Sequence, residues 1–484
     1  MDFLAPEYYL FFLPVVFLLT FGIASRQRRR QILILLVMSY LFFWLASGWH
    51  LLLLLISTCI DWTAGRKMHE SEQAAHRKRW LRISLVTNLS LLGVFKYLDF
   101  FIESWNLFSL SFTDSLDVGT LGLALPVGIS FYTFQTMSYT IDIYRKKQSP
   151  YDSFLDFACY AAFFPQLVAG PILRADHFRN EIEQPMQINA YRFRLGLTLI
   201  IYGIAKKLVI ADNLALHANT VFVEGEHLAN IGLIWWATLC FGIQIYCDFS
   251  AYTDIANGTA CLIGVRLAEN FNTPYAATTP QDCWRRWHIS LSTWLRDYLY
   301  IPLGGSRNCQ RRMVVALIIT MLLGGVWHGA SWNFVLWGLV HGILLIVHRF
   351  GSKVSFVKYF FSLTGRFGVL FSWLITQYLV FFTWLIFRVE DLSILIPSMK
   401  TFLGIEGHFD LQEMFDTLPE IKYLSFFLAA GFILLHGFSG KLNGGKMWLA
   451  RRHSLVWGVI CGIILTLAFY LRPSETIDFI YFRF

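Results

Sequence analysis

The chain has 484 residues, of which 56% are hydrophobic and 15% are charged. This composition excludes an ordinary soluble protein, in which about 25% of the residues are charged. Many apolar runs are long enough to cross a membrane as α-helices, and the short alternating segments of a membrane β-barrel are not seen. We therefore predict an all-α polytopic membrane protein.

The net charge of +8 would suit nucleic-acid binding in a soluble chain. In a membrane protein the same excess is expected, because Lys and Arg gather in cytoplasmic loops. We therefore predict a lipid bilayer as the surroundings and no nucleic-acid partner. The eight cysteines are scattered without a CxxC pair, so neither a disulfide framework nor a metal site is predicted.

Loop charge orients the predicted spans. The apolar run 8–24 is expected to be a retained first span, because no cleavage pattern follows it and the basic run 26–30 does. Residues 31–46 and 49–63 are predicted to form a hairpin that turns at 47–49. The basic segments 66–82, 145–147 and 440–452 are predicted to be cytoplasmic, and the acidic segments 103–118 and 388–422 external. This alternation predicts about 11–12 transmembrane helices, with the N-terminus outside.

The segment 154–173 departs from this pattern, because Pro165, Gly170 and Pro171 interrupt a moderately apolar run. A re-entrant element is expected here, since broken backbone must be satisfied away from lipid. No internal repeat or linker divides the chain. We therefore predict one integral membrane domain over 1–484, with a core of motif helices at about 119–350 and peripheral spans at 1–118 and 367–484.

A charged aromatic helix is predicted to start at Thr279, which can cap it, with Pro280 in the first turn. Asp282 stands where its carboxylate can bond back to the start of the helix. An aromatic and apolar stripe recurs at three- and four-residue steps through Trp284, Trp287, Leu291, Trp294 and Tyr298. His288 lies at the border of this stripe, and the helix is expected to end at the sequence PLGG.

Two interpretations of this helix remain open. It could lie on the membrane surface with its arginines on lipid phosphates. Alternatively, it could line a polar tunnel, with Arg285 and Arg286 on an anionic ligand and His288 near the chemistry. Arginine suits phosphates because its planar group bonds two oxygens at once, and coenzyme A carries three phosphate groups.

His328 lies inside a long apolar region, where a histidine is costly unless it faces a cavity or a partner. Gly324, Gly325 and Gly329 would let a backbone or a substrate approach it closely. A neutral imidazole is the usual general base near pH 7. The alternative is a histidine that bonds a neighbouring helix. His341 is expected to be such a packing residue.

At these residues the chain resembles the membrane-bound O-acyltransferase (MBOAT) superfamily. It is most similar to the bacterial branch that includes the alginate O-acetylation membrane subunit and the teichoic acid D-alanyl transferase. The resemblance is carried by 125–145, 163–174, 246–275, 284–307, 324–342 and the terminal FIYFRF at 479–484.

This resemblance implies a central tunnel in which His328 is the essential histidine and His288 the second one. It implies acetyl-CoA as a cytoplasmic donor substrate with no bound cofactor, and a location in the bacterial inner membrane. A periplasmic partner of the SGNH esterase-like class would pass the acetyl group on to an exopolysaccharide.

Further residues are weaker predictions. Asp248 and Ser250 belong to a polar run that could line the tunnel and order the histidines, or simply end a helix at the cytoplasmic side. Trp327 could wall the acyl site or only pack. Asn333 could lie near His328 or bond between helices.

Two other functions stay open. Transfer of D-alanine to teichoic acid from a carrier-protein thioester is the alternative chemistry within the family. A transporter of polysaccharide or acyl groups, with no chemistry of its own, is the alternative from another class, although the chain lacks the internal repeats that many transporters have.

Overall fold

The computed structural model describes residues 3–109, 118–167, 170–223, 225, 227–307, 309–475 and 477–482. In these ranges the regular elements are helices, and the only β-type pairing is an isolated bridge between Asn230 and His408. The prediction of an all-α fold is therefore confirmed. Residue 110 and its neighbours up to 117, in the predicted external segment, lie outside the described residues.

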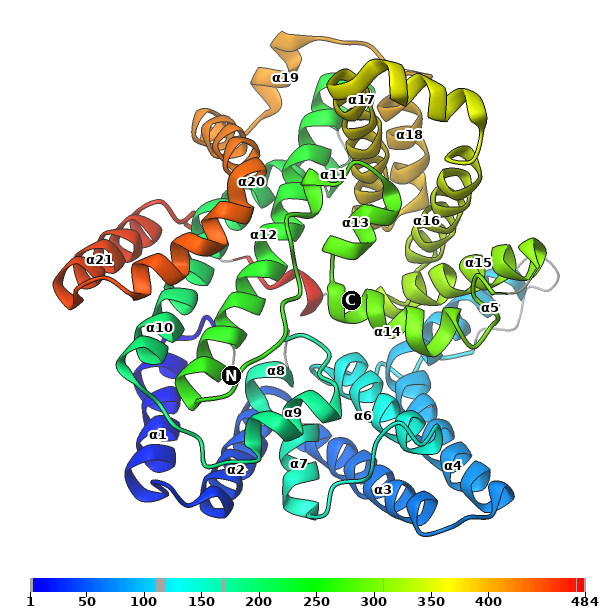
Figure 1. The fold of residues 1–484 in the computed structure, drawn as a ribbon. Coiled ribbons are helices and arrows are strands. Elements are labelled where there is room, and N and C mark those ends of the chain that lie inside the picture. The colour runs from blue at the N-terminus through cyan, green and yellow to red at the C-terminus, as the bar shows by residue number, and fades with distance from the viewer. Residues whose placement is uncertain are drawn as a thin grey trace. The chain divides into compact units, whose positions relative to one another are not determined.

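The chain forms two compact units, residues 1–197 with 256–268 and residues 198–255 with 269–484 (Figure 1). The first unit holds α1 (Leu13–Phe17), α2 (Arg28–Ser47), α3 (Leu51–His69), α4 (Ala74–Leu92), α5 (Leu98–Ser109), α6 (Ile129–Tyr144), α7 (Phe154–Ala162), α8 (Phe164–Leu167) and α9 (Ala175–Ile182). α10 (Ala190–Ala205) and α12 (Ile231–Ile263) have residues in both units. The second unit holds α11 (Asp212–Phe222), α13 (Pro280–Arg286), α14 (Ile289–Leu295), α15 (Gln310–His328), α16 (Trp332–Gly351), α17 (Ser355–Arg388), α18 (Leu392–Phe402), α19 (Leu411–Thr417), α20 (Lys422–Ala450) and α21 (Ser454–Tyr470). That the whole chain is one membrane domain stays a prediction.

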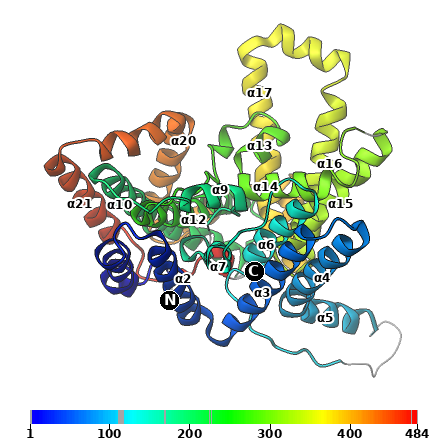
Figure 2. The ribbon, with the colours of Figure 1, turned by 60° about the horizontal axis from the view of Figure 1, so that its bottom comes forward.

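The predicted turn after the second apolar run is confirmed at Gly48, whose φ of 57° suits a residue without a Cβ. α2 and α3 diverge from this turn as a V (Figure 2), and α3 packs on α4 and α6. Buried polar groups join these helices, because the Asp61 carboxylate accepts hydrogen bonds from Ser84 Oγ at 2.6 Å and Asn88 Nδ2 at 2.9 Å. Such bonds hold helices together where no water is available.

The predicted interruption of 154–173 is also confirmed. The segment forms α7 and the four-residue α8, and Phe163 between them leaves helical geometry. Neither helix is long enough to cross a membrane. The chain around this break is buried, as expected for irregular backbone that is kept away from lipid.

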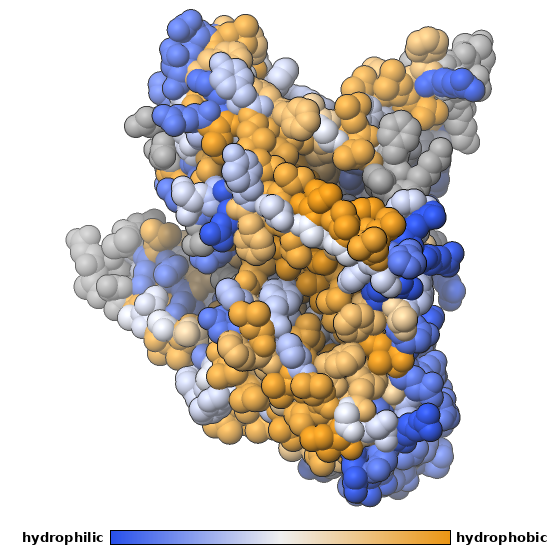
Figure 3. Space-filling view, turned by 90° about the vertical axis from the view of Figure 1, so that its left-hand side faces the viewer, coloured by the Kyte–Doolittle hydropathy of each residue, from blue (hydrophilic) through white to orange (hydrophobic). Residues whose placement is uncertain are grey.

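Six helical stretches among the described residues are long and apolar enough to cross a membrane, or seven if the bent pair Leu411–Thr417 and Lys422–Gly437 counts as one span. They are Arg28–His69, Ala74–Ser109, Ile231–Ile263, Gln310–His328, Trp332–Gly351 and Gly365–Arg388. The predicted number was higher because α2 and α3 count together here and three apolar helices have only 10–17 residues. Figure 3 shows one face on which exposed hydrophobic side chains cover a broad area, as lipid contact requires.

α15 and α16 form a closely packed pair that carries His328 at its turn. A Cβ on Gly325 would lie 2.2 Å from the Phe334 carbonyl oxygen, and one on Gly338 would lie 2.3 Å from the Met321 carbonyl oxygen. Only glycine therefore allows this approach. α17 follows and bends at Gly365, where φ is 52° (Figure 2).

Candidate active site

The charged segment begins as predicted but does not form one helix. Thr279 caps α13 by accepting a hydrogen bond from the Asp282 amide over 3.0 Å, and a proline follows it. The Asp282 carboxylate accepts from Arg286 Nε at 2.9 Å, and the predicted bond back to the helix start is not what the structure shows.

His288 separates α13 from α14, so the prediction of a continuous helix is wrong. Its backbone is left-handed, with φ 42° and ψ 57°. This conformation costs a residue with a side chain about 1–2 kcal/mol. Surrounding contacts must therefore hold His288 in place.

Asn270 supplies these contacts. Its Oδ1 accepts from the Ser290 amide at 3.2 Å and the Ser290 hydroxyl at 2.9 Å, and lies 3.1 Å from His288 Nδ1. Its main-chain oxygen accepts from the Ile289 amide at 2.9 Å. Because a backbone amide can only donate, the atom facing it must be Oδ1, and His288 Nδ1 must carry a proton. In the neutral ring, Nε2 then holds the lone pair.

His288 is fully buried and lies outside the candidate spans. Burial lowers its pKa to about 3, because the charged imidazolium loses its hydration. The ring is therefore neutral near pH 7, which is the form that can accept a proton.

His328 is the last residue of α15 and is 3% exposed. Four aromatic rings surround it, with centroid distances of 5.0 Å to Trp327, 5.0 Å to Trp337, 5.3 Å to Phe387 and 5.9 Å to Tyr481. The imidazole is therefore packed among aromatic side chains of the second unit.

The two histidines share aromatic neighbours. Trp327, predicted as an acyl-site wall or a packing residue, lies 5.7 Å from the His288 ring as well as beside His328. Phe249 lies 4.8 Å from His288 and 4.3 Å from Tyr481, which in turn contacts His328. The structure thus brings the two predicted histidines into one aromatic enclosure.

Asp248 anchors the segment that carries Tyr481. Its Oδ2 accepts from the Ile480 amide at 2.8 Å, which lays this segment (red in Figure 1) against α12. Its Oδ1 pairs with Lys207 Nζ at 3.0 Å, and Asp212 pairs with the same ammonium at 2.8 Å. A buried charge is tolerated when it is paired and hydrogen-bonded in this way. Asp248 therefore reaches the histidines indirectly, through Tyr481.

Ser250 belongs to a different cluster. It accepts from Lys206 Nζ at 2.8 Å, and Asp254 pairs with Lys206 at 2.6 Å and with Lys446 at 3.0 Å. The predicted polar run is thus divided between two faces of α12, of which the Asp248 face meets the segment 477–482.

A cavity of about 490 Å³ adjoins α13 and α14. Its lining includes three arginines, Arg285, Arg296 and Arg349, together with His348. The guanidinium groups of Arg285 and Arg349 have no hydrogen-bonding partner in the described part of the chain. Ile289, the residue after His288, also lines the cavity, which therefore reaches the histidine's immediate neighbour.

Arg286 does not line this cavity. Its guanidinium binds Asp282 and also donates to Thr273 Oγ1 at 3.2 Å. The two arginines that were predicted together therefore have different surroundings. Arg285 lines the cavity, whereas Arg286 fastens α13 to the preceding segment.

Asn333 bonds between helices. Its Nδ2 donates to the Phe387 carbonyl at 3.0 Å and the Ile386 carbonyl at 3.3 Å, which ties α16 to α17. His341 is a packing residue, as predicted, because its Nδ1 accepts from Trp284 Nε1 at 3.3 Å.

Sequence reasoning missed the individual roles of Asn270, Tyr481, Arg296 and Arg349. The first two lie inside stretches that carry the family resemblance, 246–275 and 479–484, and that was the available signal. Arg296 belongs to the charged segment and Arg349 to the end of a predicted span, where an interfacial cation is ordinary.

Comparison with known proteins agrees with this geometry. Residues 32–389 match the model of the membrane-bound O-acyltransferase family. The chain is 36% identical over 430 residues to a peptidoglycan O-acetyltransferase of Helicobacter pylori, covering 83% of this chain and 80% of that protein. It is 38% identical over 386 residues to a probable alginate O-acetylase AlgI of Pseudomonas aeruginosa, covering 79% and 71%. It is 29% identical over 280 residues to a teichoic acid D-alanyltransferase of Bacillus subtilis, covering 54% and 68%. The chain therefore belongs to the membrane-bound O-acyltransferase family and is a multi-pass membrane acyltransferase.

Proposed function

We propose that this protein is an O-acetyltransferase that takes acetyl groups from cytoplasmic acetyl-CoA and transfers them across the inner membrane for O-acetylation of a secreted polysaccharide. The observation that carries the proposal is the placement of two buried histidines around Trp327, together with an arginine-lined cavity whose lining includes Ile289, the residue after His288. The relatives named for O-acetylation are 36% and 38% identical, against 29% for the D-alanyltransferase, which favours acetyl over D-alanyl transfer.

The cavity suits an anionic donor. Arg285 and Arg349 supply guanidinium groups that can each bind two phosphate oxygens. Acetyl-CoA carries three phosphate groups and ends in a long, uncharged arm with the thioester. Phosphates held by these arginines would leave that arm free to extend past Ile289 toward the histidines.

His328 is assigned as the general base. A neutral imidazole takes the proton from an acceptor hydroxyl as its oxygen attacks the thioester carbonyl. The carbon–sulfur bond then breaks, the coenzyme A thiolate leaves, and the proton from the imidazolium is passed to it. The acetyl group ends as an ester of the acceptor, and the histidine returns to its neutral form. We assign His288 to the acetyl-CoA side of the reaction, because its ring is neutral and is held in one tautomer, with the lone pair on Nε2.

We assign the next transfer of the acetyl group, beyond this protein, to a periplasmic SGNH-type partner. Such a partner would receive the acetyl group and place it on the polysaccharide, as the relatives' names for alginate and peptidoglycan O-acetylation suggest for the final product.

The test is turnover of labelled acetyl-CoA by the purified protein in liposomes, with and without the SGNH-type partner. His328→Ala should lose at least about 100-fold in rate, since a general base contributes 10²–10⁴-fold. His217→Ala is the matched control: His217 is also fully buried and accepts from a tryptophan, but belongs to α11. Equal turnover in both variants would refute the role of His328. Turnover only with a D-alanyl carrier protein would refute the donor.

The donor cavity has its own test. Arg285→Ala combined with Arg349→Ala should weaken acetyl-CoA binding by about 10- to 100-fold per lost charged contact, because such bonds contribute about 1.5–3 kcal/mol. The loss should shrink as salt is raised. Lys353→Ala removes an exposed cation outside the cavity and should leave binding unchanged. Unchanged affinity in the double variant would overturn the cavity's assignment.

A further inference from the structure

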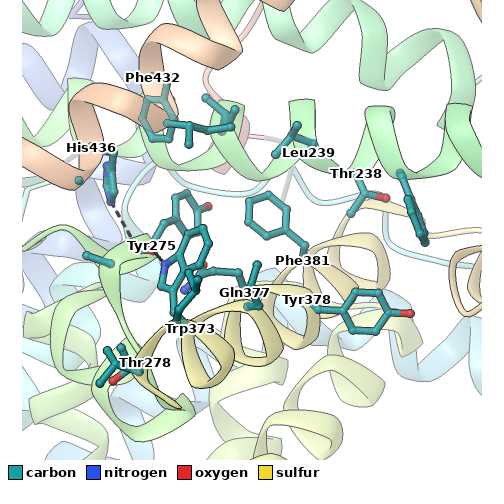
Figure 4. A pocket seen from close by; sticks show the side chains of 18 of the residues that line it. Thr238, Leu239, Tyr275, Thr278, Trp373, Gln377, Tyr378, Phe381, Phe432 and His436 are labelled. Carbon is teal, nitrogen blue, oxygen red and sulfur yellow. Dashed lines mark hydrogen bonds between the residues drawn. The ribbon is translucent and has the colours of Figure 1, made fainter. Parts of the chain in front are cut away.

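A second cavity, of about 700 Å³, lies along α17 in the second unit (Figure 4). One face of α17 lines it from end to end. Arg366, Leu370, Trp373, Gln377 and Phe381 follow one another at three- and four-residue steps. This spacing places them on a single side of the helix. We call this cavity the α17 groove.

The opposite walls come from α12 and α20. Trp235, Leu239 and Ile243 contribute from α12 at four-residue steps, and Phe432 and His436 contribute from α20. Figure 4 shows Leu239 of α12, Phe432 of α20 and Phe381 of α17 around the same space. The occupant that such a lining recognises is a hydrocarbon.

The groove is open along its side. Leu370 and Leu374 on α17 are 52% and 51% exposed, and Ile433 on α20 is 46% exposed. α17 is a candidate span from Gly365 to Arg388. The opening therefore faces the hydrocarbon of the bilayer and not water.

The length of the groove suits a lipid chain. Arg366 and Phe381 are fifteen residues apart, so the groove is about 22 Å long at 1.5 Å per residue. An extended acyl chain whose headgroup lies at Arg366 would run along this apolar length.

Arg366 supplies a charge at one end. It lies directly after the bend at Gly365, where the span begins, and its side chain is exposed. Among the described residues its guanidinium has no hydrogen-bonding or ionic partner. The start of a span lies at the level of the lipid headgroups, and a planar guanidinium binds phosphate oxygens in pairs.

We propose that the α17 groove binds one membrane phospholipid, with an acyl chain along α17 and the phosphate on Arg366. This site is separate from the donor cavity and does not depend on the proposed reaction.

The bound chain would also support the wall of the active site. Trp373 Nε1 donates to the Tyr275 carbonyl at 2.8 Å, and the Tyr275 amide donates to His436 Nε2 at 3.2 Å. The Tyr275 ring lies 6.4 Å from Trp287, the residue before His288. Filling the groove therefore supports the segment against which Trp287 packs.

The test uses a phospholipid with a photoreactive group in its acyl chain, reconstituted with the full-length protein in vesicles. Crosslinks are mapped by peptide mass spectrometry. We expect crosslinks to the groove-lining parts of α17, α12 and α20. Leu370→Trp, which fills the groove, should reduce them at least tenfold. Val347→Trp is the matched control, because Val347 is 61% exposed on α16 and lies outside the groove. Equal labelling in the two variants would overturn the proposal, since it would mean ordinary contact with surrounding lipid.

The charge is tested separately. Arg366→Gln should reduce labelling several-fold relative to Lys353→Gln, and an excess of inorganic phosphate should not displace the lipid. Equal labelling of these two variants, or displacement by phosphate alone, would overturn the headgroup assignment.

Native mass spectrometry supplies a further check. A second protein chain that leaves the complex in Leu370→Trp but not in Val347→Trp would show that a protein occupies the groove, and the lipid proposal would fail.

Discussion

Asn270→Ala should impair the enzyme by releasing His288. Asn270 is 1% exposed, and its Oδ1 is the shared acceptor for Ser290 and for His288 Nδ1. Alanine removes that oxygen. The left-handed backbone of His288 then loses the contacts that offset its strain, and the ring loses the acceptor that fixes its tautomer.

The magnitude follows from the donors that are left without an acceptor. Each buried donor that loses its acceptor costs about 1–3 kcal/mol. Two donors would lose theirs, the Ser290 amide and His288 Nδ1. The backbone strain of His288, about 1–2 kcal/mol, is then no longer offset, so the residue relaxes out of its left-handed conformation. The lost hydrogen bonds disfavour the arrangement needed for transfer by about 2–6 kcal/mol, so kcat should fall at least about 30-fold at 1.36 kcal/mol per factor of ten.

The assay is kcat for labelled acetyl-CoA together with thermal unfolding in detergent. Asn88→Ala is the matched control, because Asn88 is also buried and donates to a carboxylate, that of Asp61. It should lower stability without lowering kcat per folded molecule. Asn270→Asp keeps an accepting oxygen and should recover part of the activity. Wild-type kcat in Asn270→Ala, or an aspartate variant no better than alanine, would refute the reasoning.

Two further predictions concern stability. Because burial holds the folded pKa of His288 at about 3, below about 6.5 when unfolded, protonation favours unfolding. Lowering the pH from 7 to 5 should cost the wild type about 2 kcal/mol more than His288→Gln in detergent unfolding; equal losses would contradict this. Gly325→Ala should lower the free energy of unfolding by several kcal/mol, because the added Cβ would meet the Phe334 carbonyl. In Gly324→Ala the added Cβ would meet only the end of the Leu295 side chain, so this variant should unfold like wild type.

The sequence predicted the elements whose signals are local. Thr279 indicated the start of a helix, because a capping hydroxyl followed by a proline is recognisable in the sequence. The glycines near His328 predicted that a backbone or a substrate comes close, and the structure shows the Phe334 main chain close to Gly325. Apolar runs predicted helices for the same reason, since hydropathy is a property of each segment alone.

The break at His288 could not be predicted in this way. The aromatic stripe continues through it at helical spacing, so periodicity favours one helix. What interrupts the helix is Asn270, eighteen residues earlier, whose side chain binds His288 at the break and Ser290 just after it. Tertiary contacts of this kind override a local pattern.

Arg285 and Arg286 illustrate a second limit. Adjacent residues on a helix point about 100° apart, because one turn takes 3.6 residues. They could not both face one ligand while α13 stays helical, and the structure gives only Arg285 to the cavity. The second cation comes instead from Arg349 on α16, a neighbour that only the fold provides.

The link between Asp248 and the segment 477–482 shows why long-range positioning is harder still to predict. The bond runs from the main-chain amide of Ile480 to a carboxylate 232 positions away. A main-chain donor leaves no mark in the sequence, because almost any residue at that position carries the same amide. The residue that makes this contact specific is the acceptor, Asp248. Asp248 is fully buried, and pairing with Lys207 offsets the cost of burying its carboxylate. The position of Tyr481 beside His328 therefore rests on a charge balance within α12 and its neighbours as much as on the segment's own residues.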